Sequence, residues 1–241
     1  MHLGEARVPD GLRLYAIGDV HGCDDLLDDI HARIAADIAG RTSSSIRIVH
    51  LGDYADRGPQ TADVIERLSR LRETDDNVIC LRGNHEHMLL EFLDNPHASG
   101  VTWLSNGGEN TLRSYDIDLF GSSSIDRRMI AISRRFAEAI PAHHHHFLNT
   151  LEYSVRFGDY FFCHAGIRPG IPLDQQDPTD LIWIRDHFLE SDADFGAVVV
   201  HGHTPVEEPE IRPNRINIDT GAVFGGAMTC LILEGNEYRF L

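Results

Sequence analysis

Three short apolar segments near the start of the chain are each followed by a polar cluster and then by apolar residues at helical spacing. The segments are residues 12–17, 46–51 and 78–81. Alternation of a buried strand with an amphipathic helix indicates βα units, whose strands pair in parallel. Ligands of such sheets bind beyond the carboxyl ends of the strands. The pattern therefore predicts an α/β fold with its site in the loops at the strand ends.

The rest of the chain divides into a helical part and a strand-rich part. Residues 97–148 are mostly helical in pattern, with helices expected at 125–140 and 146–151 on either side of Pro141. We expect this segment to be an insert or flank of one domain that spans residues 1–241. Strand-like runs follow at 151–157, 160–163, 197–200, 216–218, 227–233 and 238–241. They predict a mixed sheet or two sheets.

Charge and composition exclude several classes of function. Lys+Arg 21 against Asp+Glu 38 gives a net charge of −17 at pH 7, which opposes binding to nucleic acid or to an anionic membrane. No apolar run approaches the roughly 18 residues that span a bilayer, and the N-terminus lacks the pattern of a secretory signal. We therefore expect a cytoplasmic protein. The four cysteines form no CxxC pair, which argues against a thiolate metal site.

Four consecutive histidines, His143 to His146, stand at the start of a helix-like segment. Adjacent residues on a helix point in different directions, so these four side chains cannot all reach one ion. We therefore expect them to form a solvated helix start and leave them out of the site.

Five polar clusters follow apolar runs directly, and each places Asp, His or Asn beside glycine. They occupy residues 18–22, 52–58, 82–86, 163–166 and 201–205. A single cluster of this kind is more often an ordinary loop, but five at strand ends make coincidence improbable. Carboxylate, imidazole and amide ligands suit Mn, Fe or Zn, and they exceed the need of one ion. Two ions roughly 3.5–4 Å apart can clamp a phosphoryl oxygen and acidify a bound water.

The chain contains the motifs GDVHG, GDYADRG, RGNHE, HAG and HGHT, which resemble those of the phosphoprotein phosphatase family of calcineurin-like metallophosphoesterases. The motifs extend from residue 18 to residue 205, with 29 residues between the first two and 23 between the next two. Trp103, the run Asn106-Gly107-Gly108 and the segment 218–223 also resemble bacterial members. The resemblance implies a β-sandwich of two mixed sheets flanked by helices, in four layers α/β/β/α.

The same resemblance implies a dinuclear metal centre. Its six ligands would be Asp19, His21, Asp53, Asn84, His164 and His203. Asp19 and His21 would hold the first ion, Asp53 would bridge both, and the other ligands would complete the second. His203 is preferred to His201 because the family's ligand is the histidine of a Gly-His-Thr sequence. Manganese is the expected metal, with iron or zinc as alternatives.

Other residues of these motifs would act on the substrate, again by resemblance. His85 would protonate the leaving alkoxide, and Asp56 would hold the imidazole charged and correctly turned. Arg57 and Arg185 would clamp the phosphate, with Asn84 beside it. A hydroxide that bridges the two metals would attack phosphorus in line with the leaving oxygen.

The short chain resembles the bacterial serine/threonine protein phosphatases most, which implies a phosphorylated protein or peptide as substrate. A symmetrical diadenosine tetraphosphate hydrolase is an alternative, although those enzymes tend to carry glutamine at the position of His21 and a different residue at that of Asp56. A non-catalytic phosphate-binding module is disfavoured because every ligand position is filled. A nuclease or phosphodiesterase is disfavoured by the net charge of −17. The oligomeric state is left open.

Overall fold

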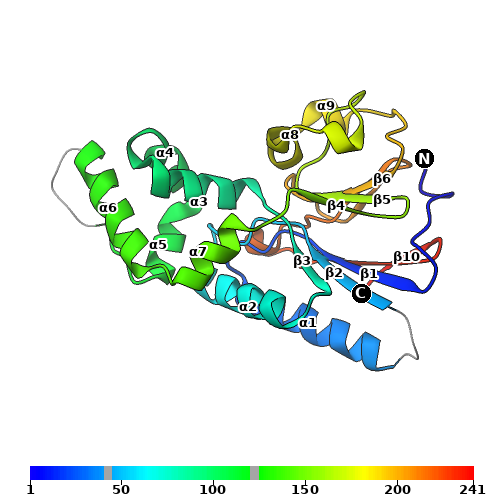
Figure 1. The fold of residues 1–241 in the computed structure, drawn as a ribbon, viewed down its shortest axis with the longest axis horizontal. Helices are drawn as coiled ribbons and strands as arrows, with labels where there is room; N and C mark the ends of the chain where they lie inside the picture. The colour runs from blue at the N-terminus through cyan, green and yellow to red at the C-terminus, as the bar shows by residue number, and fades with distance from the viewer. Residues whose placement is uncertain (41–44, 120–124) are drawn as a thin grey trace.

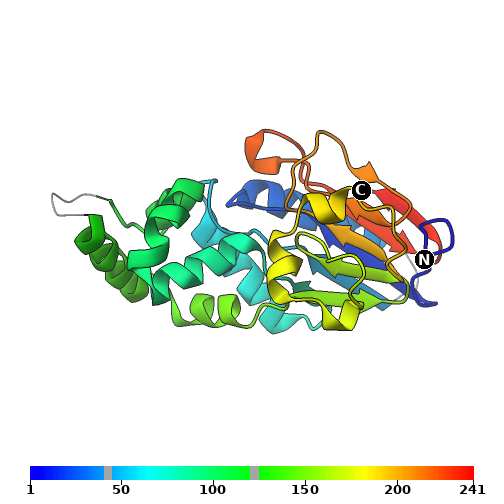
Figure 2. The ribbon, with the colours of Figure 1, turned by 90° about the horizontal axis from the view of Figure 1, so that it is seen from above.

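Two mixed five-stranded β-sheets lie face to face in the computed structural model of the chain, which describes residues 1–40, 45–119 and 125–241 (Figure 1; Figure 2). The first sheet has the order β10-β9-β1-β2-β3, with strands β1 (Leu12–Ile17), β2 (Ser45–His50), β3 (Val78–Cys80), β9 (Cys230–Glu234) and β10 (Glu237–Phe240). The second has the order β4-β5-β6-β8-β7, with strands β4 (Ser154–Phe157), β5 (Tyr160–Cys163), β6 (Val198–His201), β7 (Glu210–Ile211) and β8 (Arg215–Asn217).

Parallel pairing occupies one part of each sheet. In the first sheet β1, β2 and β3 run in parallel, while β9 and β10 are antiparallel additions. In the second sheet β5, β6 and β8 run in parallel, and β4 and β7 form antiparallel edges. The α/β fold with two mixed sheets, expected from the βα pattern and the family resemblance, is confirmed. Because parallel strands end at the same edge of a sheet, their following loops gather there.

The core of the sandwich consists of alternate residues from the facing strands. Leu14, Val49 and Leu231 of the first sheet pack in one buried cluster with Phe162 and Val200 of the second. Since side chains alternate across a strand, the neighbours of these residues point outward, where helices cover them. The two inner faces therefore hold the sheets together, and each outer face binds helices.

Helices complete the four layers. The first sheet and its neighbouring core are covered by α1 (Asp24–Ala39), α2 (Thr61–Thr74) and α3 (Asn84–Asp94). The outer face of the second sheet packs against α8 (Pro178–Trp183) and α9 (Asp186–Leu189). Two short 3₁₀ turns lie at Leu173–Gln175 and Ala222–Phe224. The arrangement is the α/β/β/α order that the resemblance implied.

A group of helices extends from one end of the sandwich (Figure 1). It contains α4 (Pro96–Trp103), a π-helical turn (Leu104–Gly108), α5 (Glu109–Ser114), α6 (Ile125–Ala139) and α7 (Ala142–Asn149). Helix α6 lies where it was expected, but the expected start of the next helix at residue 146 is wrong. Pro141, with φ −60° and ψ 144°, precedes the helix and lets it begin at Ala142.

The expectation that the histidine run is a solvated helix start is also wrong for one of its members. His144 is buried together with Phe147 and Leu148, and these residues form the inner face of α7. His145 and His146 are exposed, as expected.

None of the helices in the described part of the chain has the length and apolar character of a membrane span.

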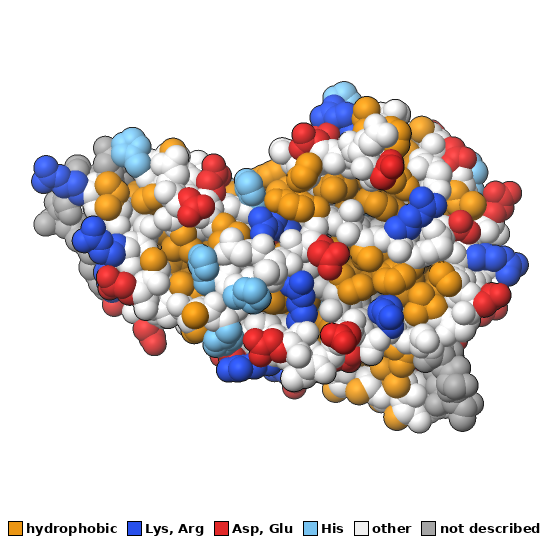
Figure 3. All heavy atoms as spheres, viewed as in Figure 1, with side chains coloured by type: hydrophobic (Ala, Val, Ile, Leu, Met, Phe, Trp, Pro, Cys, Tyr) orange, Lys and Arg blue, Asp and Glu red, His pale blue; other side chains and the backbone are white. Residues whose placement is uncertain are grey.

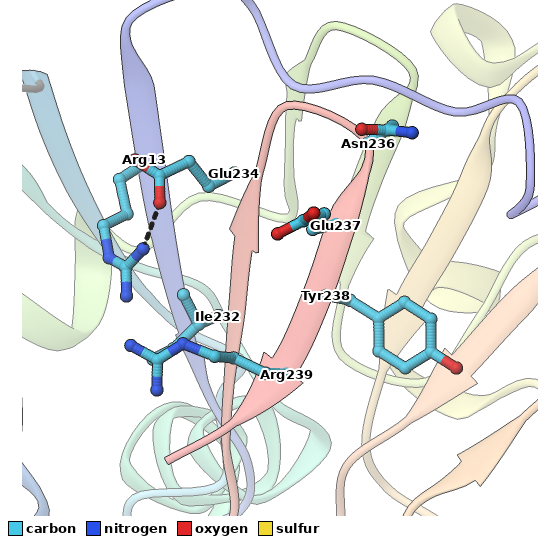
Figure 4. Close-up of a pocket in the computed structure, with 7 residues that line it drawn as sticks. All are labelled: Arg13, Ile232, Glu234, Asn236, Glu237, Tyr238 and Arg239. Atoms are coloured by element: carbon cyan, nitrogen blue, oxygen red, sulfur yellow. Dashed lines mark hydrogen bonds and ion pairs between the residues drawn. The ribbon is translucent and has the colours of Figure 1, made fainter.

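An ion-pair network ties α1 to the first sheet. Arg13 and Arg239 donate to the carboxylate of Asp37 at 2.7 and 2.6 Å, and the hydroxyl of Tyr15 donates to it at 2.6 Å. Figure 4 shows Arg13 and Arg239 beside a pocket on the hairpin β9–β10, with Arg13 also paired to Glu234. Because Arg13 lies near the start of β1, this pocket is remote from the loop that follows the strand. We assign the ion-pair network around Asp37 a structural role.

Asp37→Asn is expected to lower the free energy of unfolding at pH 7 by about 2 kcal/mol, since it weakens charge-assisted hydrogen bonds. Burial alone would raise the pKa of Asp37, but Tyr15, Arg239 and Arg13 outweigh it and lower that pKa below its ordinary 3.8. The stabilisation is therefore present above about pH 4 and is lost as the pH falls toward the folded-state pKa. Urea unfolding at pH 7 and pH 3 measures the difference. Asp29→Asn, an exposed carboxylate on the same helix, is the control.

Candidate functional site

The loops at the strand ends bring several of the predicted metal ligands, and the predicted proton donor His85, into two buried groups. His21, Asp53 and His85 form one group, and Asp53, His164 and His203 form the other; in each, the ligand atoms lie within 4.8 Å of one another. These residues follow β1, β2, β3, β5 and β6, so each comes from the carboxyl end of a strand that pairs in parallel. Asp53 belongs to both groups, which is the position required of a bridging ligand.

The backbone around these residues is strained. His21, Asp53, Asp56, Arg57 and His203 all have positive φ, between 43° and 70°. Side chains other than glycine rarely adopt this region, and such residues cluster at functional sites because the surrounding fold holds them there. The left-handed turns let Asp53 and Asp56 of the GDYADRG loop both lie near His85, at 3.9 Å from Nε2 and 2.7 Å from Nδ1.

Close approach to Asp53 explains the glycine of the third cluster. A Cβ atom at Gly83 would lie 2.1 Å from Oδ1 of Asp53 and 2.3 Å from its backbone nitrogen. No side chain can be accommodated at this distance. Gly83 thereby lets the start of α3, with Asn84 and His85, come against the loop after β2.

Histidine protonation is set by backbone carbonyls. Nδ1 of His21 lies 2.8 Å from the carbonyl of Ala55, and Nδ1 of His164 lies 3.0 Å from that of Leu51. A carbonyl can only accept, so both Nδ1 atoms carry a proton, and both Nε2 atoms face Asp53, at 3.4 and 3.3 Å. A hydrogen bond from Nδ1 to a carbonyl is the arrangement found for metal-ligating histidines.

In the second group, two histidine nitrogens meet one amide oxygen. Nε2 of His164 and Nδ1 of His203 lie 3.0 and 2.8 Å from Oδ1 of Asn84. Burial lowers the pKa of His164, but the carboxylates of Asp53 and Asp19 outweigh it and raise that pKa to about 9. Positive charge at this position, carried by a proton or by a metal ion, is stabilised by these carboxylates. The donor set therefore fits a metal ion.

Asp19 lies beside these groups. Its carboxylate accepts the backbone N–H of His203 at 3.2 Å. Burial and the neighbouring carboxylates of Asp219 and Asp53 raise its pKa well above the ordinary value. The same crowding raises the pKa of Asp219. The segment 218–223 stands out in the sequence, but Asp219 within it was given no role. Only the fold brings this carboxylate close to those of Asp19 and Asp53.

His85 and Asp56 form a buried pair. Nδ1 of His85 lies 2.7 Å from Oδ2 of Asp56, and Nε2 of His85 has no hydrogen-bond partner among the described residues. Nε2 is also 3.9 Å from the Asp53 carboxylate. Burial lowers the pKa of His85, but Asp53 and Asp56 outweigh it, and the net pKa is raised above 6.5. The imidazole therefore holds a proton on Nε2, beside the ligand cluster.

The helices that extend from the sandwich hold Asp56. Nε1 of Trp103 donates to its carboxylate at 3.0 Å, and the hydroxyl of Thr111 donates to it at 2.6 Å. The Thr111 hydroxyl also accepts the backbone N–H of Asp56 at 2.9 Å. The backbone N–H of Arg57 donates to the carbonyl of Gly107 at 3.2 Å. Trp103 and Gly107 belong to motifs noted in the sequence, whereas nothing in the sequence singled out Thr111.

Thr111→Val is expected to lower the rate on substrates with poor leaving groups by about tenfold, because Asp56 would orient His85 less well. The rate on p-nitrophenyl phosphate, whose leaving group needs little protonation, is expected to change much less. Thr111→Ser keeps the hydroxyl and should restore the wild-type ratio of the two rates. Equal losses on both substrates would contradict a positioning role for Thr111.

The two arginines differ in their surroundings. Arg57 is half-buried; its Nη1 lies 2.6 Å from Nε2 of His21, and its guanidinium lies 5.5 Å from the ring of Phe224. A metal ion and this hydrogen bond cannot share the same Nε2 lone pair, so metal binding requires Arg57 to turn away from His21. Arg185 is exposed at the rim and donates to the hydroxyl of Thr204 at 3.2 Å. Both guanidiniums border the ligand cluster.

Glu86 supports the loop after β2. It is fully buried, and its two carboxylate oxygens accept the backbone N–H groups of Asp53, Tyr54, Ala55 and Gly83 at 2.7 to 3.0 Å. One side chain thus fixes the start of α3 to the strained loop. His201, by contrast, turns away from the cluster: its ring packs on Phe188 and lies near Arg215.

Comparison with known proteins agrees with this arrangement. The family model described as calcineurin-like phosphoesterase matches residues 12–226. The asymmetrical bis(5'-nucleosyl)-tetraphosphatase PrpE of Oceanobacillus iheyensis is 27% identical over 241 residues, covering 94% of this chain and 91% of the relative. The enzyme of the same name from Bacillus mycoides is 29% identical over 234 residues, covering 89% and 88%.

Solved structures share the fold at lower identity. A putative diadenosine tetraphosphatase superposes with a TM-score of 0.65 and 19% identity, covering 98% of this chain and 97% of the other. A cold-active protein-tyrosine phosphatase of a psychrophilic Shewanella superposes with a TM-score of 0.67 and 17% identity, covering 97% and 80%. The common architecture therefore extends over nearly the whole chain.

Proposed function

The chain belongs to the calcineurin-like phosphoesterase family, and we propose that it is a serine/threonine protein phosphatase that hydrolyses phosphomonoesters of proteins or peptides. The observation that supports this most is the pair of His85 and Asp56. Nδ1 of His85 lies 2.7 Å from the Asp56 carboxylate, while Nε2 has no hydrogen-bond partner among the described residues. A proton held in this way serves a leaving group that is a poor anion, such as the alkoxide of serine or threonine.

The proposed mechanism divides the work among residues of the loops. Asp19, His21, Asp53, Asn84, His164 and His203 would hold two metal ions, with manganese expected and iron or zinc as alternatives. Such ions supply acidified water and neutralise charge on the phosphoryl oxygens. Arg57 and Arg185 bind the phosphate from the rim, and Asn84 lies beside it. His85 donates its Nε2 proton to the leaving oxygen, while Asp56 keeps the imidazole turned and charged.

A second candidate is hydrolysis of a dinucleoside tetraphosphate with asymmetrical cleavage. The curated relatives carry that name, and it differs from the symmetrical cleavage considered from the sequence. Two exposed aromatic side chains near the ligand cluster favour it. Phe224, 68% exposed, lies against Arg57, and Trp183, 39% exposed, has its ring 6.2 Å from that of His203. Aromatic faces of this kind can stack on a nucleobase.

Rates on four substrates separate these functions. Manganese-loaded protein is compared on phosphoserine, phosphothreonine and phosphotyrosine peptides and on diadenosine tetraphosphate, with kcat/KM as the readout. Highest values on the first two peptides are expected. A higher value on the dinucleotide, with ATP and AMP as products, would replace the first proposal by the second, and two ADP would indicate symmetrical cleavage. The strongest rate on phosphotyrosine would contradict the serine/threonine assignment.

The net charge bears on the choice of macromolecular partner. A net charge of −17 gives no general positive surface for a nucleic acid or an anionic membrane. We propose that neither is a partner and that the protein acts in the cytoplasm.

Phe224→Ala provides a further test of the substrate: it should lower the rate on diadenosine tetraphosphate if that molecule is the substrate, and leave the peptide rates unchanged.

A further inference from the structure

Two of the four consecutive histidines meet one carboxylate of another helix. Nε2 of His143 and Nε2 of His144 lie 2.5 and 2.7 Å from the same oxygen of Glu66, Oε2. Glu66 comes from α2 and the histidines from α7, two helices in contact (Figure 1). The three ligand atoms lie within 4.8 Å of one another. The four histidines cannot all reach one ion, but these two can.

The hydrogen bonds that these side chains make to other residues do not use the three ligand atoms. Arg70 donates to the other oxygen of Glu66, Oε1, at 2.9 Å. The hydroxyl of Tyr115 lies 2.8 Å from Nδ1 of His144. A tyrosine hydroxyl can donate or accept, so it can accept a hydrogen bond from Nδ1–H when the Nε2 lone pair binds a metal. Tyr115 thus provides the outer contact that orients most metal-ligating histidines.

Burial orients the group and still leaves it accessible. The His144 side chain is 4% exposed and is held by the contacts of α7, whereas those of His143 and Glu66 are 30% and 44% exposed. Figure 3 shows histidine side chains gathered on the surface around α7. An ion could therefore reach the three atoms from solvent and keep a water as its fourth ligand. Nitrogen and oxygen donors of this number suit zinc or a similar divalent transition ion.

We infer that Glu66, His143 and His144 form a binding site for one divalent transition-metal ion of the zinc type, separate from the two groups at the strand ends. In the ion-bound state Oε2 of Glu66 and the two Nε2 atoms move apart slightly, since tetrahedral ligands are separated by the ion. Each neutral histidine then carries its proton on Nδ1, and Nδ1–H of His144 donates a hydrogen bond to the hydroxyl of Tyr115. No proton has to leave the protein.

The site would connect the projecting helices to the catalytic loop. Helix α2 begins at Thr61, whose hydroxyl accepts the backbone N–H of Asp56 at 3.2 Å. Helix α7 packs on α2, and Tyr115 follows α5, which carries Thr111. An ion that joins α2 to α7 would also tie the end of α5 to α2 through the contact of Tyr115 with His144, and both α2 and α5 carry threonines that contact Asp56. Its expected effect is on stability rather than on the chemistry.

Metal content of the manganese-loaded protein tests the inference. Zinc is titrated into the wild type and the variants His143→Ala and Glu66→Gln, and bound zinc and manganese are measured together after dialysis. The matched control is His145→Ala, which removes an exposed histidine from the same helix. The wild type and His145→Ala are expected to retain one ion per chain more than the other two variants, with at least a tenfold difference in zinc affinity.

This difference of one ion does not depend on the number held at the strand ends, nor on any activity. Zinc should also raise the Tm of the wild type and of His145→Ala, and leave that of His143→Ala unchanged. Equal metal content in the wild type and His143→Ala would overturn the site, because Glu66, His143 and His144 would then be only a hydrogen-bonded cluster. An equal loss of the ion in His145→Ala would overturn the choice of ligands.

Discussion

Asp53→Asn is expected to lower metal-dependent hydrolysis of p-nitrophenyl phosphate by at least about 1,000-fold, or about 4 kcal/mol of transition-state stabilisation. Asp53 is the carboxylate that the two buried ligand groups have in common among the described residues. Burial raises its pKa, but His164 and His85 outweigh it and hold the pKa well below 3.8, so Asp53 is ionised. Asparagine keeps the shape and removes the charge that faces both groups.

The measurement is kcat/KM over a range of manganese concentrations, because a variant that merely bound metal more weakly would recover activity at high manganese. Asp219→Asn is the matched control: it removes another buried carboxylate from the same cluster and leaves both ligand groups intact. We expect a smaller loss for this control. Full activity of Asp53→Asn, or an equal loss in Asp219→Asn, would contradict the bridging assignment.

His85→Asn is expected to have the second large effect. It removes the proton on Nε2 and should slow hydrolysis of a phosphoserine peptide by about 100- to 10,000-fold. p-Nitrophenyl phosphate should lose much less, because p-nitrophenolate leaves without a proton. The measured quantity is the ratio of the two kcat values in the wild type and the variant.

His87→Asn is the control for this prediction. His87 lies on the same helix, two residues further along, and is half-buried. The same change in chemistry at that position should leave both rates near those of the wild type. Losses of equal size on both substrates in His85→Asn would indicate that His85 acts as a metal ligand or a structural residue, as its place in the group with His21 and Asp53 also permits.

Much of the fold could be predicted because it depends on local patterns. The strand expected at residues 12–17 is β1, and the strand expected at 46–51 is β2 moved by one residue. Buried strands of this kind are short apolar runs bounded by glycine and polar residues, which a sequence displays directly. The clusters that follow them also gather as expected, since parallel strands end at one edge of a sheet.

The errors concern contacts between distant segments. His144 is buried against Tyr115 and Glu66 while the adjacent His145 is exposed, and both of these partners lie far from it along the chain. Thr111 is an ordinary helical threonine until the fold brings its hydroxyl to Asp56, a residue 55 positions earlier. Such roles depend on the packing of helices and cannot be read from spacing along the chain.

The sequence by itself determined the α/β class and the residue types of the candidate ligands, because apolar periodicity and residue type are properties of short stretches of chain. Only the tertiary structure decided how those residues are used. It placed Asp53 between two ligand groups, left Nε2 of His85 without a hydrogen-bond partner among the described residues, and joined His143 to Glu66 across two helices. The reason is physical: protonation, strain and coordination depend on distances of a few ångströms between atoms, and folding sets these distances.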